Sequence, residues 1–474
     1  MDLSRASFKL FLSKGGNALV VFAGLAFFTR QLDATQLGVF FLFQTLLGLL
    51  AIPADLGISV ALEKRLSEGT SADGAARVLG TAVVFKLCTL AVVVAAVLLA
   101  RRYVEDFLGS GLVGYLVVGL VLVEFSKLYV HAVRGELRVG ETASITFADR
   151  FVWIGLGAAL VVLGFGVEGL VLGLLAGRAV SFGWAYHRCS TRLGAPSRAQ
   201  LRSLYAFSKY QTVTAVGGRV YSWMDLAFVG LFLAPHYVSA YEVAWQITLL
   251  VILVSKSIAM TLFPQVSRWS ATADLDRLES VLPTALGFGL FVSIPALVGA
   301  AIYAEEILVY LFTPEYAIAA MVLVVLMAEK VVQSVNDIVE GLVRSLDHPE
   351  LAARATVVGI TLNVVLSPLL LATVGFVGAA IATTLSWLVN TSLHVRYLSR
   401  FVAIDPPYRL VGWYILASLV MGGLLVVVET AVPVTGLPVL LVEIGFGAAV
   451  YVAVSAAIPE VRTRVIAPGL RVLA

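Results

Sequence analysis

The sequence predicts an all-α integral membrane protein with about 14 transmembrane helices. Of its 474 residues, 60% are hydrophobic and only 13% are charged. Soluble domains carry about 25% charged residues, so this composition excludes them. The apolar residues also come in runs of roughly twenty, the length that crosses the hydrocarbon core of a bilayer. The net charge of only +3 gives no indication of a nucleic-acid surface.

The expected spans follow one another with short connections, so no extramembrane enzyme domain is predicted. They cover residues 10–29, 37–61, 78–100, 110–133, 143–165, 169–187, 204–231, 237–262, 283–303, 316–343, 353–373, 376–398, 410–428 and 436–457. The first residues, MDLSRASFKL, lack the apolar core of a cleavable signal peptide. Cys88 and Cys189 stand in no CxxC or metal-ligand spacing, and we therefore expect no metal site and no cofactor.

The positive charges of the loops predict the orientation. Assigning the loops alternately to the two faces puts 22 lysines and arginines on one face and only Arg30, Arg101 and Arg102 on the other. Cytoplasmic loops carry the excess of Lys and Arg. Both termini are therefore expected in the cytoplasm, in a multi-pass protein of the cell membrane.

Weak internal similarity predicts a parallel repeat of two six-helix lobes. Residues 32–40 (LDATQLGVF) match 233–241 (LAPHYVSAY) at an offset of 201. Residues 166–173 (GVEGLVLG) match 375–382 (GFVGAAIA) at an offset of 209, and Arg134 matches Arg344 at 210. An even number of helices per repeat makes both lobes run in the same direction, as in several transporter folds. We expect an N-lobe (1–187), a cytoplasmic linker (188–203), a C-lobe (204–400) and an extra helix pair with a tail (401–474).

Charged residues inside the spans indicate where water or a ligand enters. A charge at the bilayer centre costs about 2.5–3.5 kcal/mol, so the deep cations need a partner or water. These cations are Lys86, Lys127, Arg178, Arg219 and Lys330.

The fourth and tenth spans, which are repeat mates, each carry a polar stripe at helical spacing. The stripes are Glu124, Lys127, His131, Arg134 and Arg138, and Glu329, Gln333, Asn336, Asp337, Glu340 and Arg344. Two stripes on equivalent helices favour facing walls of a cavity. A buried salt-bridge seam is the alternative, and Glu124 and Lys127, three residues apart, can also pair with each other.

Deep arginine and lysine side chains favour an anionic ligand. Arg219 can bind a phosphate through two hydrogen bonds, whereas a lysine offers a point charge. A hydrophobic cation would instead need carboxylates and aromatic faces, and Asp225 and Glu340 keep that alternative open. The sequence has no GxxxxGK[ST], HExxH or GxSxG motif, so no catalytic residues are predicted.

Three segments carry a family resemblance. They are residues 29–69 with Asp55-Leu56-Gly57, residues 219–244 with Asp225, and residues 355–389 with Asn363 and Pro368. The chain resembles the polysaccharide and lipid-linked oligosaccharide flippases of the multidrug/oligosaccharidyl-lipid/polysaccharide (MOP) exporter superfamily, over nearly its whole length through residue 400. The motifs are loose and characterise the superfamily better than the substrate.

The resemblance implies a central cavity lined by the first, second, fourth, seventh, eighth and tenth helices. It implies a polyprenyl- or dolichyl-linked sugar as substrate, moved by alternating access for surface polysaccharide or glycoprotein synthesis. On this basis Arg219, Lys127, Lys14 and Arg178 are candidates for binding the substrate head group. Candidates for polar or ion-coupling roles are Asp225, Glu124, His131, Gln333, Asn336, Asp337 and Glu340. Asp55 is interpreted as structural, paired with Lys64 or Arg65.

The expected partners are the lipid-linked oligosaccharide, membrane lipid, a coupling ion (H⁺ or Na⁺) and glycosyltransferases. A multidrug or cation antiporter of the same superfamily is the alternative function. A membrane glycan polymerase or ligase is a third hypothesis, disfavoured by the short outward loops.

Overall fold

The computed structural model describes residues 20–467, except 70, 110, 272–274 and 347. Residues 209–222, 261, 264, 270, 271 and 466 are described by their backbone alone. Every regular element within these ranges is a helix, as the composition predicted. Contacts divide the chain into two compact units, one of residues 31–239 and one of residues 240–474 with the residues before 31.

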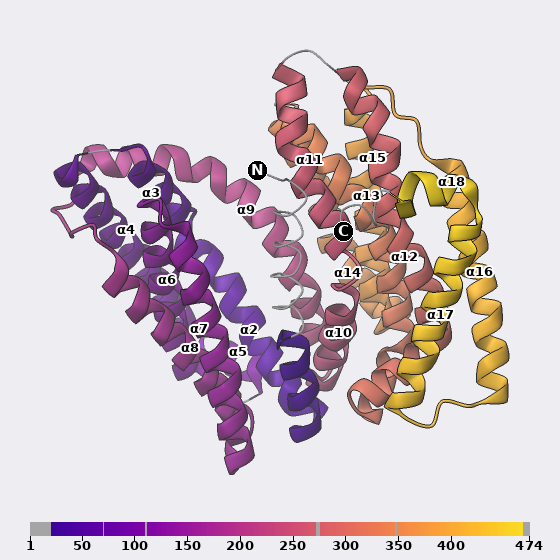
Figure 1. The fold of residues 1–474 in the computed structure, drawn as a ribbon. Coiled ribbons are helices and arrows are strands. Elements are labelled where there is room, and N and C mark those ends of the chain that lie inside the picture. Colours follow the sequence, from indigo (N-terminus) through magenta and orange to yellow (C-terminus); the bar gives the residue numbers. More distant parts are fainter. Residues whose placement is uncertain (1–19, 70, 110, 272–274, 347, 468–474) are drawn as a thin grey trace. The chain divides into compact units, whose positions relative to one another are not determined.

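The unit of residues 31–239 contains helices α2 to α9 (Figure 1). Their bounds are α2 Ala34–Asp55, α3 Ile58–Ser67, α4 Ala72–Leu99, α5 Arg101–Leu108, α6 Val113–Gly135, α7 Val139–Leu160, α8 Gly166–Arg188 and α9 Arg198–Phe232. A π-helical turn, Val161–Phe165, joins α7 to α8. The predicted lobe boundaries stay a prediction, because the two compact units are defined by contacts between residues and not by the internal repeat.

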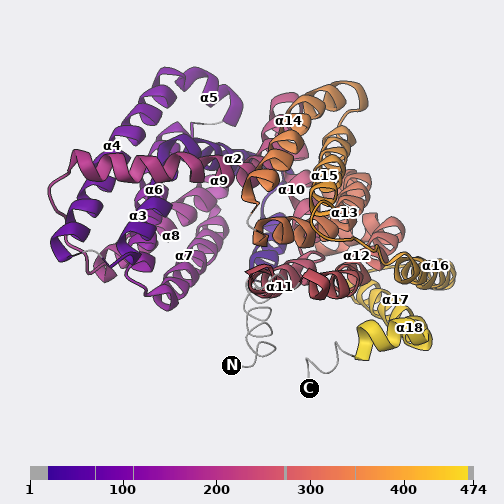
Figure 2. The ribbon, with the colours of Figure 1, turned by 90° about the horizontal axis from the view of Figure 1, so that it is seen from above.

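The other unit begins with residues 20–30 of the helical segment Val20–Gln31. After residue 239 its elements are the remainder of α10 (Pro235–Thr248), α11 Leu253–Ala271, α12 Leu275–Leu311, a 3₁₀ turn Pro314–Ala319, α13 Ala320–Ser345, α14 Pro349–Val374, α15 Val377–Leu398, α16 Tyr408–Ala431, α17 Leu437–Ala457 and α18 Pro459–Val461. A π-helical turn, Arg462–Ile466, follows α18. In both views α16, α17 and α18 lie together beside α12 (Figures 1 and 2).

The helices confirm a multi-pass membrane protein. In the part of the chain that the structure describes, nine helices are long and apolar enough to cross a membrane, or ten if the bent pair α10–α11 is one span. That pair bends by 54°. The count of fourteen spans stays a prediction.

Equivalent glycines support the predicted repeat. Gly166 starts α8 with φ 54° and ψ −137°, and Gly375 precedes α15 with φ 83° and ψ −150°. Both have the positive φ that favours glycine. Three residues later, a Cβ on Gly169 would meet Leu160 at 3.0 Å, and one on Gly378 would meet the carbonyl oxygen of Leu370 at 2.2 Å. The same backbone turn thus recurs at an offset of 209, and each glycine closely approaches a leucine near the end of the preceding helical segment, Leu160 and Leu370.

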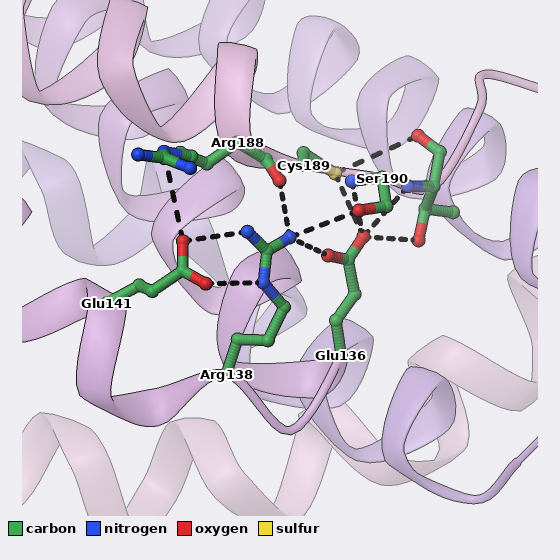
Figure 3. Close-up of polar contacts among 7 residues, drawn as sticks. Glu136, Arg138, Glu141, Arg188, Cys189 and Ser190 are labelled. Carbon is green, nitrogen blue, oxygen red and sulfur yellow. Dashed lines mark hydrogen bonds and ion pairs between the residues drawn. The ribbon is translucent and has the colours of Figure 1, made fainter.

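The start of the linker is fixed to the unit of residues 31–239 (Figure 3). Glu136, in the α6–α7 turn, accepts hydrogen bonds from the backbone amides of Ser190 and Thr191, both at 2.8 Å. Arg138 donates to the carbonyl oxygen of Arg188 at 2.6 Å and forms an ion pair with Glu141 at 2.7 Å. Further along, the amide of Gly194 donates to the carbonyl of Ala76 at 2.9 Å. The linker is therefore held by hydrogen bonds to α4 and to the α6–α7 turn.

Candidate functional site

A cavity of about 460 Å³ lies inside the unit of residues 31–239. Five helices contribute to its lining, and among the lining residues are Gln44 and Gly48 from α2, Glu124, Lys127, His131 and Arg134 from α6, Asp149 and Trp153 from α7, Arg178 and Ser181 from α8, and Trp223 from α9. The polar stripe predicted on the fourth span therefore faces a cavity, apart from Arg138 in the adjoining turn. A volume of this size is in the range of small-molecule sites.

Behind this cavity, Lys86 is the centre of a buried ionic network. The end of α2, a left-handed turn at Leu56 and Gly57 (φ 45° and 74°), places Asp55 beside α4 and α6. The Lys86 ammonium donates to Asp55 at 2.5 Å and also forms an ion pair with Glu124. Its side chain is 0% exposed. The deep lysine is thus neutralised by two carboxylates from two other helices.

Lys127 connects this network to the cavity. It forms an ion pair with the second oxygen of Asp55 and lines the cavity with a side chain that is 15% exposed. Asp55 also accepts from the Ser59 hydroxyl at 2.6 Å. Glu124 and Lys127 each pair with a residue of another helix, Glu124 with Lys86 of α4 and Lys127 with Asp55 of α2. The pairing suggested for Asp55 was wrong: Arg65 instead pairs with Glu68 at 2.9 Å.

A second ion pair lies in the wall formed by α7 and α8. Arg178 donates to Oδ2 of Asp149 at 2.7 Å, and the aspartate side chain is only 7% exposed. The two helices can approach closely because α8 presents glycine here. A Cβ on Gly177 would lie 2.4 Å from the carbonyl oxygen of Asp149.

One end of the cavity carries His131 and Arg134. His131 shares a hydrogen bond with Glu63 of α3 at 2.5 Å. This hydrogen bond holds the pKa of Glu63 below its ordinary value. Arg134 donates to the hydroxyl of Thr142 at 3.3 Å. His131 therefore lies between a carboxylate and the cavity.

Two tryptophans, Trp153 and Trp223, add aromatic surface to the cavity. The indole of Trp223 lies against Gly48, where a Cβ would be 2.8 Å from the ring. The Trp153 ring lies 6.2 Å from that of Phe40, centroid to centroid, tilted by 31°. Neither the two tryptophans nor Asp149 were among the residues predicted from the sequence, where the cations inside the spans gave the strongest signal. A carboxylate inside the apolar segment 143–165 was the available signal for Asp149.

The predicted polar residues of the tenth span lie on α13, in the other unit. Lys330 is fully buried, paired with Glu329 at 2.6 Å, and it lies 3.6 Å above the ring of Trp245. Lys330 also donates to Gln333 at 2.9 Å, and the Ser255 hydroxyl donates to Asp337 at 3.2 Å.

Further along α13, the Asn336 amide donates to Glu340 at 3.1 Å, and Glu340 pairs with Arg344 at 2.8 Å. The stripe on α13 therefore consists of separate polar contacts along the helix, with further contacts to Ser255 of α11 and Thr391 of α15.

The remaining predicted site residues are Asp225, Arg219 and Lys14. Asp225 lies on α9 and is 1% exposed. Arg219 lies on the same helix, but its side chain is outside the described residues, and so is the whole of Lys14. Their head-group roles stay predictions.

The chain matches two family models. The model described as "Polysaccharide biosynthesis protein" matches residues 27–321. The model described as "Lipid II flippase MurJ" matches residues 211–447. Together they cover most of the chain.

Two relatives from Haloferax volcanii are similar over most of the chain. The "Probable low-salt glycan biosynthesis flippase Agl15" is 42% identical over 455 residues, 96% of each chain. The "Probable flippase AglR" is 30% identical over 423 residues, 86% of each chain. The names of these relatives are those of flippases, which confirms the expectation of a transporter rather than an enzyme.

Solved structures share the fold. Lipid II flippase MurJ in an inward closed conformation matches with a TM-score of 0.80 at 15% identity, covering 94% of this chain and 98% of its own. An inward-facing multidrug resistance MATE family transporter matches with a TM-score of 0.66 at 17% identity, covering 81% and 94%. From the family models and the relatives, the chain belongs to the polysaccharide biosynthesis protein family, among the flippases of the MOP exporter superfamily.

Proposed function

We propose that this protein moves a polyprenyl- or dolichyl-phosphate-linked oligosaccharide across the cell membrane by alternating access. The 42% identity to a glycan biosynthesis flippase over 96% of both chains carries the proposal. In this mechanism the lipid tail stays in the bilayer, and the sugar-phosphate head group crosses through polar cavities of the helix bundle. Charged side chains inside the membrane are energetically costly, and in this mechanism they are retained because they bind the head group of the substrate.

Lys127 is the residue we assign to the phosphate. Its partner Asp55 keeps Lys86 and Ser59 when Lys127 turns toward a ligand. When Lys127 leaves Asp55 for the phosphate, no buried carboxylate therefore becomes unpaired. An unpaired buried carboxylate would cost roughly 3–5 kcal/mol. Arg178 and Arg219 are the further cations proposed for the head group, with Lys14 as the fourth.

The proposal extends to orientation, coupling and partners. The proposal places both termini in the cytoplasm, and the excess of Lys and Arg on one set of loops supports this orientation. Two of these basic segments, the turn around Arg138 and the linker at Arg188, are joined by a hydrogen bond. A coupling ion, H⁺ or Na⁺, is assigned to the carboxylates of the polar stripes, among them Asp337 and Glu340. Glycosyltransferases supply the substrate.

Reconstitution tests the transport. The full-length protein in vesicles should move a labelled lipid-linked oligosaccharide to the opposite leaflet, whereas Lys127→Ala should slow this at least about tenfold, the loss of one charge-assisted hydrogen bond. Arg101→Ala, which breaks an exposed pair with Glu105, is the matched control and should transport normally. Efflux of cationic dyes without movement of the glycan lipid would instead establish the antiporter.

Orientation is tested separately, by labelling introduced cysteines from outside intact cells in a background without Cys88 and Cys189. Arg102→Cys should react with a membrane-impermeant maleimide, and Arg192→Cys should react only after the cells are opened. The reverse pattern would place the termini outside.

A further inference from the structure

Three polar atoms of side chains in the α7–α8 wall of the cavity have no hydrogen-bond partner within the described residues. They are Oδ1 of Asp149, Nε of Arg178 and the indole Nε1 of Trp153. All three side chains line the cavity. Asp149 is more than nine-tenths buried, and only its other oxygen, Oδ2, is bound by Arg178. A buried polar group without a hydrogen-bond partner costs free energy. A ligand that supplies the missing partners to this wall therefore binds favourably.

The types of these atoms restrict the class of ligand. The ion pair offers one acceptor on Asp149 and one donor on Arg178, on the same short bridge. A phosphate only accepts hydrogen bonds and cannot use the aspartate oxygen, whereas an ammonium group only donates and cannot use the arginine. A hydroxyl group does both. Two neighbouring hydroxyls, as on a sugar ring, fit the pair.

The aromatic surface favours the same class. The C–H groups on the face of a sugar ring are apolar and carry slight positive charge, which suits the electron-rich face of an aromatic ring. Trp153 lies one helical turn after Asp149 on α7, and Trp223 faces the same cavity from α9. Gly48 leaves room for the Trp223 indole, since any side chain there would displace the ring.

We infer that this cavity binds a sugar ring of the oligosaccharide, stacked on a tryptophan, with adjacent hydroxyls on Asp149 and Arg178. This inference rests on the proposed function and deepens it. The phosphate belongs to Lys127, whereas recognition of the sugar belongs to α7, α8 and α9. The two parts of the head group are thereby recognised by separate residues.

Binding of the two parts of the substrate tests the inference. One probe is the free oligosaccharide released by mild acid from the cell's own lipid-linked glycan. The other is polyprenyl phosphate without sugar. In purified full-length protein, Asp149→Asn should raise the Kd of the free oligosaccharide about tenfold, as expected when a charged acceptor of a hydrogen bond is replaced by a neutral amide. It should leave the Kd of polyprenyl phosphate within about twofold, whereas Lys127→Ala should show the opposite pattern.

Replacing the tryptophans gives a second test, which leaves the ion pair of Asp149 and Arg178 in place. Trp153→Ala and Trp223→Ala should weaken oligosaccharide binding, and the corresponding changes to Phe should restore most of it because a ring remains. Trp184→Ala, an exposed position on α8, is the matched control and should bind normally.

Unchanged oligosaccharide binding in Asp149→Asn and both tryptophan variants would overturn the inference, as would a wild-type protein that binds polyprenyl phosphate and no free oligosaccharide. Failure of the proposed function has a different signature. In that case, the wild-type protein does not flip the labelled lipid-linked glycan in vesicles, whatever these variants bind.

Discussion

Lys86 donates a hydrogen bond to Asp55 at 2.5 Å, and the two side chains are 0% and 5% exposed. The bridge joins α4 to the end of α2, and the ion pair of Lys86 with Glu124 extends it to α6. A buried charge without its partner is strongly unfavourable, so the three helices are held by mutual neutralisation. Asp55 also binds Lys127, which makes it the point where the structural network meets the cavity.

Replacing Lys86 should destabilise the fold. Lys86→Met leaves the Asp55 and Glu124 carboxylates buried without their shared cation, which lowers the free energy of unfolding by about 3–5 kcal/mol. Thermal unfolding in detergent measures the change. Arg101→Met, which breaks an exposed ion pair, should change stability by less than about 1 kcal/mol. Equal losses in the two variants would contradict a structural role for Lys86.

Replacing Lys127 should separate transport from stability. Asp55 retains Lys86 and the Ser59 hydroxyl in Lys127→Met, so this variant should lose less stability than Lys86→Met. Transport of the lipid-linked glycan should nevertheless fall at least about tenfold. Lys127→Arg, which keeps the positive charge, should recover part of the activity. A variant that melts like Lys86→Met and transports like the wild type would exclude the phosphate role.

The membrane class, the repeat and the polar stripe on α6 were predictable from the sequence, because each depends on residue type and spacing along one chain segment. The partners of the charges were not. Asp55 was assigned to nearby Lys64 or Arg65, but it pairs with Lys86 and Lys127, 31 and 72 residues away. Spacing along one helix does not encode which other helix faces it. Trp153 and Trp223 were missed for the same reason, since tryptophan in an apolar span gives no signal until the walls of a cavity are known.

The contact between α7 and α8 should depend on Gly177. A Cβ there would lie 2.4 Å from the carbonyl oxygen of Asp149, and backbone atoms cannot yield as a flexible side chain does. Gly177→Ala should therefore cost about 1–3 kcal/mol of stability through overpacking. Gly183→Ala is the matched control on the same helix, where a Cβ would meet no atom within 4 Å. Ala is the better helix former, so this control should be neutral or stabilising. A harmless Gly177→Ala would mean that the helices are farther apart.

Acid should weaken the contact between α3 and α6. The hydrogen bond from His131 lowers the pKa of Glu63 from its ordinary value of 4.5. A carboxyl group with a lowered pKa binds fewer protons in the folded state than in the unfolded state. Its stabilisation is therefore present above about pH 4.5, and it is lost as the pH falls through the lowered pKa. Melting temperatures between pH 3 and pH 6 should drop less steeply for Glu63→Gln than for the wild type. Parallel curves would show that the pair contributes nothing.

The helix pair α16–α17 should depend on Tyr303 of α12. The Tyr303 hydroxyl donates to Glu443 of α17 at 2.5 Å, and both residues are buried, 1% and 3% exposed. The second oxygen of Glu443 has no partner within the described part of the chain, so this hydroxyl is its one protein hydrogen bond there. Tyr303→Phe removes the donor, keeps the ring and leaves the carboxyl group unpaired, which should cost about 1–3 kcal/mol. Replacing both residues, by Tyr303→Phe and Glu443→Leu, should restore part of that loss, because no polar group then remains buried. Two measurements show how firmly α16 and α17 are held to α12. They are the rate of limited proteolysis in the connection between α15 and α16 and the melting temperature. A double variant less stable than Tyr303→Phe alone would show that Glu443 has a role beyond this contact.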